Sequence, residues 1–200
     1  TKSGGVRRNK LSDFQGIKRN GKIAMKLDDG DAIIGVGLCN AAQNDILLTT
    51  ALGRCIRFAT EEVRVFAGRD STGVRGIRLA EGDSVISMAI LRSVEATPAE
   101  RAAYVKHANA MRRAAGDDAD VEDVAAPDDD EAEGGDLAAL SPERIAELGA
   151  AEEVILTVST EGFGKRSSAY EFRRTGRGGQ GLLAQDLTKK GGRLAASFPV

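Results

Sequence analysis

The sequence has few of the side chains on which most enzyme active sites depend. Its 200 residues include one histidine, two cysteines and no tryptophan, and only 4% are aromatic. No CxxC pair, HExxH motif or P-loop occurs in it, so none of these common metal or nucleotide sites is indicated. The single histidine, His107, falls in an alanine-rich stretch predicted to be an exposed helix, without a neighbouring nucleophile. We therefore predict no catalytic residue, no metal site and no cofactor in this chain.

Long hydrophobic runs are also absent. The sequence contains no stretch of 18 or more apolar residues and no charged-then-apolar leader, so neither a membrane span nor a secretion signal is predicted. Cys39 and Cys55 lack the spacing of metal ligands. We interpret them as reduced, buried or half-buried thiols of a cytoplasmic protein.

What the sequence has instead is a pattern of short strands that occurs three times, with a period near 50 residues. The second repeat (residues 46–91) is complete, and its predicted strands alternate apolar and polar residues. We therefore expect one face of each sheet to lie in solvent. Glycines such as Gly53 supply the tight turns between strands. Its four strands are predicted at Ile46–Thr50, Cys55–Phe58, Gly73–Leu79 and Val85–Leu91.

The other two repeats show the same order of predicted strands and turns. The first repeat (residues 4–36) carries strand patterns at Gly21–Leu27 and Ile33–Val36. No room for its first strand precedes it, so we expect the chain to be part of a longer polypeptide. The third repeat (residues 154–198) has its strands at Val154–Ser159, Gly162–Arg166, Gly181–Leu187 and Leu194–Phe198. Such a period predicts an all-β, propeller-like array in which four-stranded antiparallel blades bury their faces against their neighbours.

Residues 94–153 interrupt the array and divide the chain into 1–93, with two blades of which the first is incomplete, and 154–200, with a further blade. Thr97–Glu100 is a capping box that predicts a helix to Ala115, and Ser141–Leu148 predicts a second, short helix. Residues 117–136 contain 11 acidic residues and almost no large apolar ones, and are predicted to be disordered. The segment is thus interpreted as a partly helical, partly disordered acidic insertion. It would serve as a solvated tether or as an acidic competitor for the basic blades.

Charge is segregated between the insertion and the repeats. Residues 95–153 contain 17 Asp/Glu against 5 Lys/Arg, a net of −12, and the rest contains 13 against 23, a net of +10. A basic β array is typical of proteins that bind the phosphate backbone of nucleic acids. The glycine-rich stretch 176–181 is predicted to bring backbone N–H groups and Arg177 close to a phosphate.

At these residues the chain resembles a known family. Gly21–Leu27, Val74–Leu79 and Gly162–Arg166 closely resemble successive blades of the C-terminal domain found in the A subunits of bacterial DNA gyrases, which are type IIA topoisomerases. The resemblance covers residues 1–92 and 154–200. It implies a β-pinwheel, a six-bladed relative of the propeller whose basic rim wraps DNA, with roughly the third to fifth blades present here.

Two features depart from the family pattern. The family's first-blade box, Gln-Arg-Arg-Gly-Gly-Lys-Gly, is not in this sequence. The nearest stretch, Thr175–Gly181, keeps Arg-Gly-Gly and the final glycine but lacks the opening glutamine, the first arginine and the lysine. The insertion is also outside the common pattern.

The resemblance implies a module that binds and wraps duplex DNA without sequence specificity, in a gyrase that introduces negative supercoils using ATP. The cleavage tyrosine, ATP and Mg²⁺ would then belong to other parts of the complex. That complex would be a heterotetramer of two A and two B subunits, located in the bacterial cytoplasm at the nucleoid. The phosphate contacts are predicted at Arg7, Arg8, Lys18, Arg19, Lys22, Arg57, Arg69, Arg75, Arg78, Lys165, Arg166, Arg173, Arg174 and Arg177.

Two alternatives remain open from the sequence. One is the equivalent domain of topoisomerase IV, which shares these blades but typically has fewer of them. The other is a protein-interaction propeller that binds an acidic partner or its own insertion. A salt series distinguishes the second, because a phosphate binder loses affinity steeply as salt rises.

Overall fold

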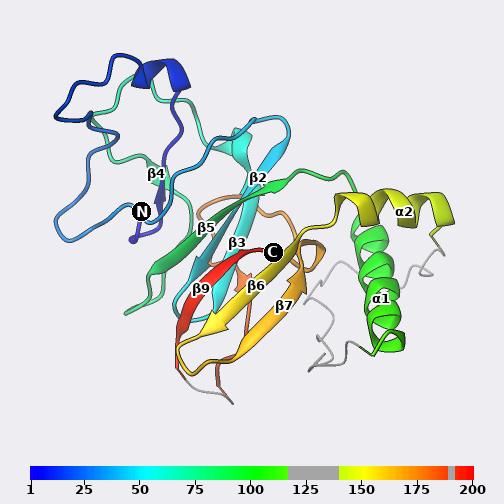
Figure 1. Ribbon diagram of the computed structural model, residues 1–200. Helices are drawn as coiled ribbons and strands as arrows, with labels where there is room; N and C mark the ends of the chain where they lie inside the picture. Colours follow the sequence, from blue (N-terminus) through cyan, green and yellow to red (C-terminus); the bar gives the residue numbers. More distant parts are fainter. Residues whose placement is uncertain (117–139, 189–191) are drawn as a thin grey trace.

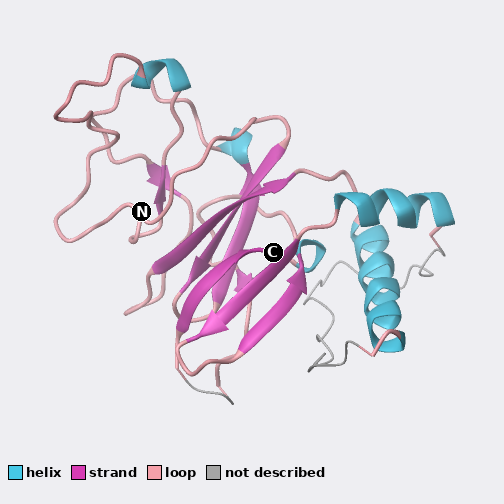
Figure 2. Cartoon of the chain, viewed as in Figure 1, coloured by secondary structure: helices cyan, strands magenta, loops and turns pink. Residues whose placement is uncertain are grey.

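The computed structural model describes residues 1–116, 140–188 and 192–200. Two antiparallel sheets occupy its centre, with loops of the first repeat on one side and a pair of helices on the other (Figures 1 and 2). The predicted all-β array is therefore confirmed for the repeats, together with the helical part of the insertion.

The central sheet has the strand order β5-β2-β3-β8. Its main hairpin joins β2 (Asn44–Thr50) to β3 (Arg54–Ala59), and Gly53 makes the turn with a φ of 86°. Such a positive φ is open to glycine at little steric cost. β5 (Val85–Arg92) pairs with the other edge of β2. These three strands agree with the sequence prediction within two residues.

The second sheet is built from the third repeat alone. It has the order β7-β6-β9, formed by β6 (Val154–Ser159), β7 (Gly164–Ser168) and β9 (Leu194–Pro199). Short 3₁₀ helices follow the inner hairpin strands in all three repeats, at η1 (Leu11–Phe14), η2 (Thr60–Glu62) and η3 (Ala169–Glu171). The three repeats thus share one local plan.

The fourth strand of the central blade comes from the next repeat, which corrects the expectation that a repeat forms a blade by itself. β8 (Leu182–Leu183) belongs to the third repeat but pairs with β3 of the second. In the same way β4 (Val74–Arg75) of the second repeat pairs with β1 (Gly5–Val6) of the first. Successive repeats are therefore linked by exchanged strands.

The strands predicted at 21–27 and 33–36 are not formed among the described residues. A strand requires a hydrogen-bonded neighbour. Residues 33–36 correspond to β5, which pairs with β2, and residues 21–27 correspond to the segment that contains β4. Neither stretch has such a partner strand in the described part of the chain, so the first repeat remains largely in loops.

The core lies on both faces of the central sheet. Leu47 and Leu91 pack with Ile155 and Phe172 between the two sheets. Ile46 and Phe58 belong to a second cluster, which also contains side chains of the first repeat. The expectation of one solvent-facing side is therefore wrong for this sheet, because β2 and β3 are buried on both faces.

The two helices of the insertion form as predicted. α1 (Pro98–Ala114) begins with the Thr97 capping box and proline in its first turn, and α2 (Pro142–Ala151) extends three residues beyond the predicted end. Tyr104 of α1 packs edge-on against Tyr170 of the third repeat, with ring centroids 5.2 Å apart. This contact fixes α1 to the third blade. The prediction of disorder for 117–136 concerns residues outside the described ranges.

The two cysteines are both unpaired, as expected, but differ in environment. Cys55 is buried on β3, and burial raises the pKa of its thiol to about 12. Cys39 is exposed, so its predicted burial was wrong. Cys39 lies in the loop that follows the first repeat and precedes β2, and no described strand packs over it.

Candidate nucleic-acid interface

Exposed basic side chains lie on two equivalent segments, residues 21–27 and 73–79. Each begins with a positive-φ glycine, Gly21 at 78° or Gly73 at 97°. Lys22, Lys26, Arg75 and Arg78 are all exposed on these segments. The prediction omitted Lys26, although aligning the two repeats places it opposite Arg78. The third repeat has no cation at the corresponding positions, so the basic edge belongs to the first and second repeats.

Each of these segments is contacted by an arginine of the following repeat, Arg69 for residues 21–27 and Arg177 for residues 73–79. Each arginine lies four residues before its repeat's glycine, Gly73 or Gly181. The Arg177 guanidinium donates to the carbonyl of Arg75 at 3.0 Å, and the Arg69 guanidinium donates to the carbonyl of Ile23. Both arginines were predicted as phosphate contacts. In the structure their side chains hold the backbone of the two segments that carry the exposed basic residues.

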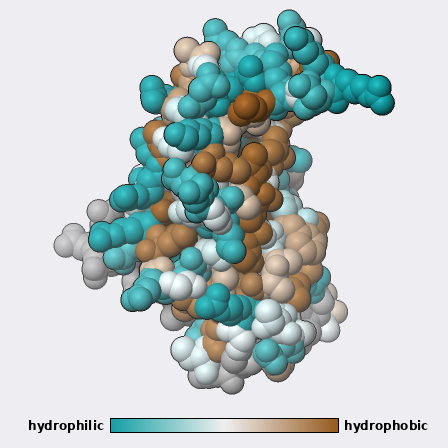
Figure 3. Space-filling model, turned by 90° about the vertical axis from the view of Figure 1, so that its left-hand side faces the viewer, coloured by the Kyte–Doolittle hydropathy of each residue, from teal (hydrophilic) through white to brown (hydrophobic). Residues whose placement is uncertain are grey.

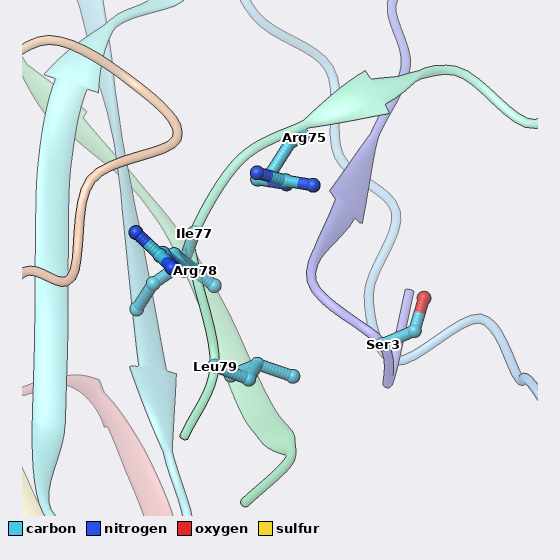
Figure 4. A pocket seen from close by; sticks show the side chains of 5 residues that line it. All are labelled: Ser3, Arg75, Ile77, Arg78 and Leu79. Atoms are coloured by element: carbon cyan, nitrogen blue, oxygen red, sulfur yellow. The ribbon is translucent and has the colours of Figure 1, made fainter. Parts of the chain in front are cut away.

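Arg75 and Arg78 line a shallow hollow with a volume of about 560 Å³ (Figure 4). Ile77, Leu79 and Ser3 complete its lining. Ile77 is only 2% exposed, which anchors the segment while its basic neighbours remain in solvent. The alternation predicted for this stretch is confirmed for Ile77 and Leu79, which pack in the core, and for Arg78, which is exposed, but it is wrong for Gly76, which was expected on the side of Arg78 and is buried.

A second basic group surrounds Phe66, in the loop between η2 and β4. The guanidinium carbons of Arg7 and Arg64 lie 4.4 and 4.1 Å from the ring centroid. Burial lowers the pKa of Arg7, opposed by nearby Asp70 and reinforced by Arg64. Arg64 is exposed and was missed by the sequence analysis, since nothing in its neighbourhood distinguishes it from an ordinary surface arginine. Stacking of this kind holds the guanidinium groups in fixed positions.

Arg57 does not belong to the interface, and its prediction as a phosphate contact was wrong. Its side chain is 7% exposed and pairs with Asp45, itself 1% exposed, at 2.9 Å. It also donates to the carbonyls of Ala169 and Arg92. Burial of an arginine requires such complete pairing. Arg174, 39% exposed, joins the cluster with an ion pair to Asp45 at 3.0 Å, so these residues link the second blade to the third.

Two backbone N–H groups of the glycine-rich loop 176–181 are bonded to the second repeat. The backbone N–H of Arg177 donates to the Glu62 carboxylate at 2.9 Å. The N–H of Gly178 donates to the carbonyl of Gly76 at 2.6 Å. The predicted use of these two N–H groups and of the Arg177 side chain for phosphate binding is thus corrected, because they hold the loop against the second repeat.

The remaining predicted residues are spread over the array. Arg8 is half-buried and donates to the carbonyl of Val63 at 2.7 Å. Those on the first repeat are exposed and precede the segment 21–27: Lys18 and Arg19. Those on the third repeat are exposed or half-buried and lie on or after β7: Lys165, Arg166 and Arg173. The structure therefore brings together part of the predicted set.

The described residues contain no group of three or more His, Cys, Asp or Glu side chains suited to a metal ion. Within these same ranges, no helix has the length and apolar character needed to cross a membrane.

Comparisons with known proteins agree with this architecture. A family model described as "DNA gyrase C-terminal domain, beta-propeller" matches residues 1–40, 44–92 and 153–200. The DNA gyrase A protein of Granulibacter bethesdensis is 56% identical over 100% of this chain and 22% of its own length. The DNA gyrase A protein of Rickettsia bellii is 44% identical over 100% of this chain and 21% of its own length. The chain therefore spans about a fifth of these relatives.

A solved structure shows the same fold. The C-terminal domain of DNA topoisomerase IV superposes with a TM-score of 0.64 at 16% sequence identity, over 100% of this chain and 44% of that one.

Proposed function

The chain belongs to the DNA gyrase C-terminal domain family, and from this premise we propose that it binds duplex DNA on the edge carrying Lys22, Lys26, Arg75 and Arg78 and bends the duplex around the array. The observation that carries the proposal is the placement of exposed cations on equivalent segments of successive repeats, with Lys26 and Arg78 at corresponding positions. Cations on successive repeats suit a phosphate backbone that runs along the array.

The contacts should select deformable DNA more than particular bases. Phosphate contacts carry no sequence information directly. Lys22, Lys26 and Arg78 lie on segments without regular structure, and Arg75 lies at the end of the two-residue strand β4, so no helix or long ribbon presents these side chains to the major groove. We therefore propose wrapping without base specificity, as part of a gyrase that supercoils DNA.

We assign ATP hydrolysis and DNA cleavage, the other steps of supercoiling, to parts of the complex outside this chain. ATP, Mg²⁺ and the cleavage chemistry would belong to other domains of a complex of two A and two B subunits at the bacterial nucleoid. Topoisomerase IV remains the nearer alternative, since its domain shares the fold. The similarity to gyrase A proteins at 56% and 44% identity favours gyrase.

A salt series tests DNA binding. Affinity for a mixed-sequence duplex, measured by fluorescence anisotropy, should fall linearly with salt on logarithmic axes, with a slope of about −0.9 for each phosphate contact. Four contacts would give a slope between about −3 and −4. A flat dependence, or no binding at low salt, would instead favour a protein-interaction propeller.

Deleting residues 117–136 should tighten DNA binding most at low salt. The deleted stretch contains 11 acidic residues and no basic ones, and a tether keeps such charges at roughly millimolar effective concentration near the basic repeats. The competition should fade above about 0.15 M salt, where the Debye length falls below about 8 Å. The same anisotropy series on the deletion variant measures this, and an equal change at every salt concentration would show that the segment is only a tether.

A further inference from the structure

Residues 73–79 of the second repeat and 181–187 of the third are exchanged segments with the same backbone geometry. In each, two successive N–H groups donate to one carbonyl oxygen of the preceding repeat. That oxygen belongs to Gly4 for the second repeat, at 2.8 and 3.3 Å, and to Gly53 for the third, at 2.7 and 3.3 Å. Both glycines have a positive φ, 88° and 86°. Positions in the two segments can therefore be compared directly.

The strand register shows which residues correspond. Arg75 lies opposite Gly5 in the pairing of β4 with β1, and Leu183 lies opposite Arg54 in the pairing of β8 with β3. Gly5 and Arg54 each directly follow the glycine whose carbonyl is shared. Arg75 and Leu183 therefore occupy the same position on successive repeats.

The charge on these segments changes sign in the third repeat. Three residues beyond Arg75 lies Arg78, and three residues beyond Leu183 lies Asp186, and both are exposed. The first repeat has Lys26 at this position. The order along the chain is thus lysine, arginine and aspartate. At the neighbouring position an arginine gives way to a leucine, whose side chain cannot bind phosphate.

Asp186 is presented in the same way as the corresponding arginine. The residue before each of them is buried, Ile77 with 2% exposure in the second repeat and Gln185 with 7% in the third. The carboxylate of Asp186 accepts hydrogen bonds from the N–H and the hydroxyl of Thr188, at 2.9 and 2.6 Å. An acidic group is therefore held on the exposed side of the segment, where the second repeat has a cation.

Arg54, the basic residue opposite Leu183, is used within the joint between the repeats. Its guanidinium donates to the carbonyls of Gln180 and Gly181, at 3.0 and 2.8 Å. These contacts hold the beginning of the exchanged segment against β3.

Hydrophilic residues on the side that carries the first repeat gather at its top, above a more apolar area (Figure 3). A hydrophilic surface can carry both signs of charge, and only its cations attract a phosphate backbone. A carboxylate at the position of a phosphate contact repels the duplex instead, as like charges do across an interface. The extent of DNA contact therefore depends on the charge that each repeat places on its segment.

We propose that Asp186 marks where a bound duplex leaves the basic edge. This boundary rests on the proposed DNA binding: phosphates contact the segments 21–27 and 73–79, and the duplex turns away before segment 181–187. The length of duplex that is held is then limited by side-chain charge and not by the fold, because the backbone geometry is the same in the second and third repeats.

Replacing Asp186 with lysine should extend the contact to the third repeat. The affinity for a mixed-sequence duplex of about 30 bp should rise about 5- to 10-fold at about 0.1 M salt, and the salt slope should steepen by about 0.9, the value of one added phosphate contact. Fluorescence anisotropy measures both quantities. Asp186→Asn keeps an acceptor oxygen for Thr188 and removes only the charge, so it should tighten binding by a smaller factor. Circular dichroism melting checks that both variants are folded.

Glu147→Lys is the matched control, because it makes the same change in net charge at a position on α2 that is 68% exposed. This variant should leave the salt slope unchanged. Equal effects of Asp186→Lys and Glu147→Lys would overturn the boundary while leaving DNA binding intact, as would an Asp186→Asn chain that binds no more tightly than the parent. A parent chain that binds no DNA at low salt would overturn the proposed function itself, and the boundary with it.

Duplex length provides a second readout. Anisotropy titrations use duplexes lengthened from about 10 to about 40 bp, by about one helical turn at a time. Apart from the proportional gain in binding registers, the affinity of the parent chain should level off at a shorter length than that of Asp186→Lys. Levelling at the same length in both chains would contradict the boundary.

Discussion

Replacing Asp45 with alanine should destabilise the fold by roughly 3–5 kcal/mol, the usual cost of removing one partner from a buried ion pair. The substitution leaves the guanidinium of Arg57, 7% exposed, without a counter-ion between the two sheets. Urea denaturation followed by circular dichroism measures the effect. Asp29→Ala is the control, since Asp29 is exposed in a turn and should change stability by less than about 0.5 kcal/mol.

The corresponding change at Arg57 separates a structural role from a DNA contact. Arg57→Ala should lower the free energy of unfolding by a similar amount and leave the DNA affinity of the folded fraction unchanged. A variant of parental stability with weakened DNA binding would show that Arg57 contacts phosphate after all, contrary to its placement between Asp45 and Ala169.

Replacing Arg75 and Arg78 together with alanine should weaken DNA binding about 10- to 100-fold at 0.1 M salt and reduce the salt slope by up to about 2. The loss should be equal for all sequences, because phosphate contacts do not read bases. Anisotropy titrations with two unrelated duplexes measure both quantities.

A matched pair of cations on α1 provides the control for that experiment. Lys106→Ala with Arg113→Ala removes the same charge from exposed positions, on a helix attached to the third blade. If this control reduces the slope as much as the loss of Arg75 and Arg78 does, binding follows net charge and the basic edge is not the site.

The sequence predicted those elements whose signals are local. The β2–β3 hairpin follows from alternation around Gly53, and α1 follows from the Thr97 capping box and its proline. The exchanged strands could not be predicted in this way, because the pairing of β8 with β3 joins residues that are more than 120 positions apart.

The candidate site was predicted less completely than the fold. Arg78 was identified by its alternation with Ile77 and Leu79, and the structure leaves both Arg78 and the predicted contact Arg75 exposed. Arg57 was misplaced because the sequence does not show which basic residues meet a buried carboxylate. A signal existed, since Arg57 lies directly opposite Leu47 in the hairpin, and Leu47 is 1% exposed. An arginine beside a core leucine on the same face is expected to be buried with it.

The most direct test of the central claim is whether DNA bends around the basic edge. A nicked plasmid is ligated in the presence of increasing amounts of the chain, the protein is removed, and the topoisomers are separated on a gel. Wrapping in a positive crossover predicts a shift towards positive linking number that grows with the ratio of protein to DNA and is lost when Arg75 and Arg78 are replaced. An unchanged topoisomer distribution under conditions where the plasmid is saturated with protein would contradict the account.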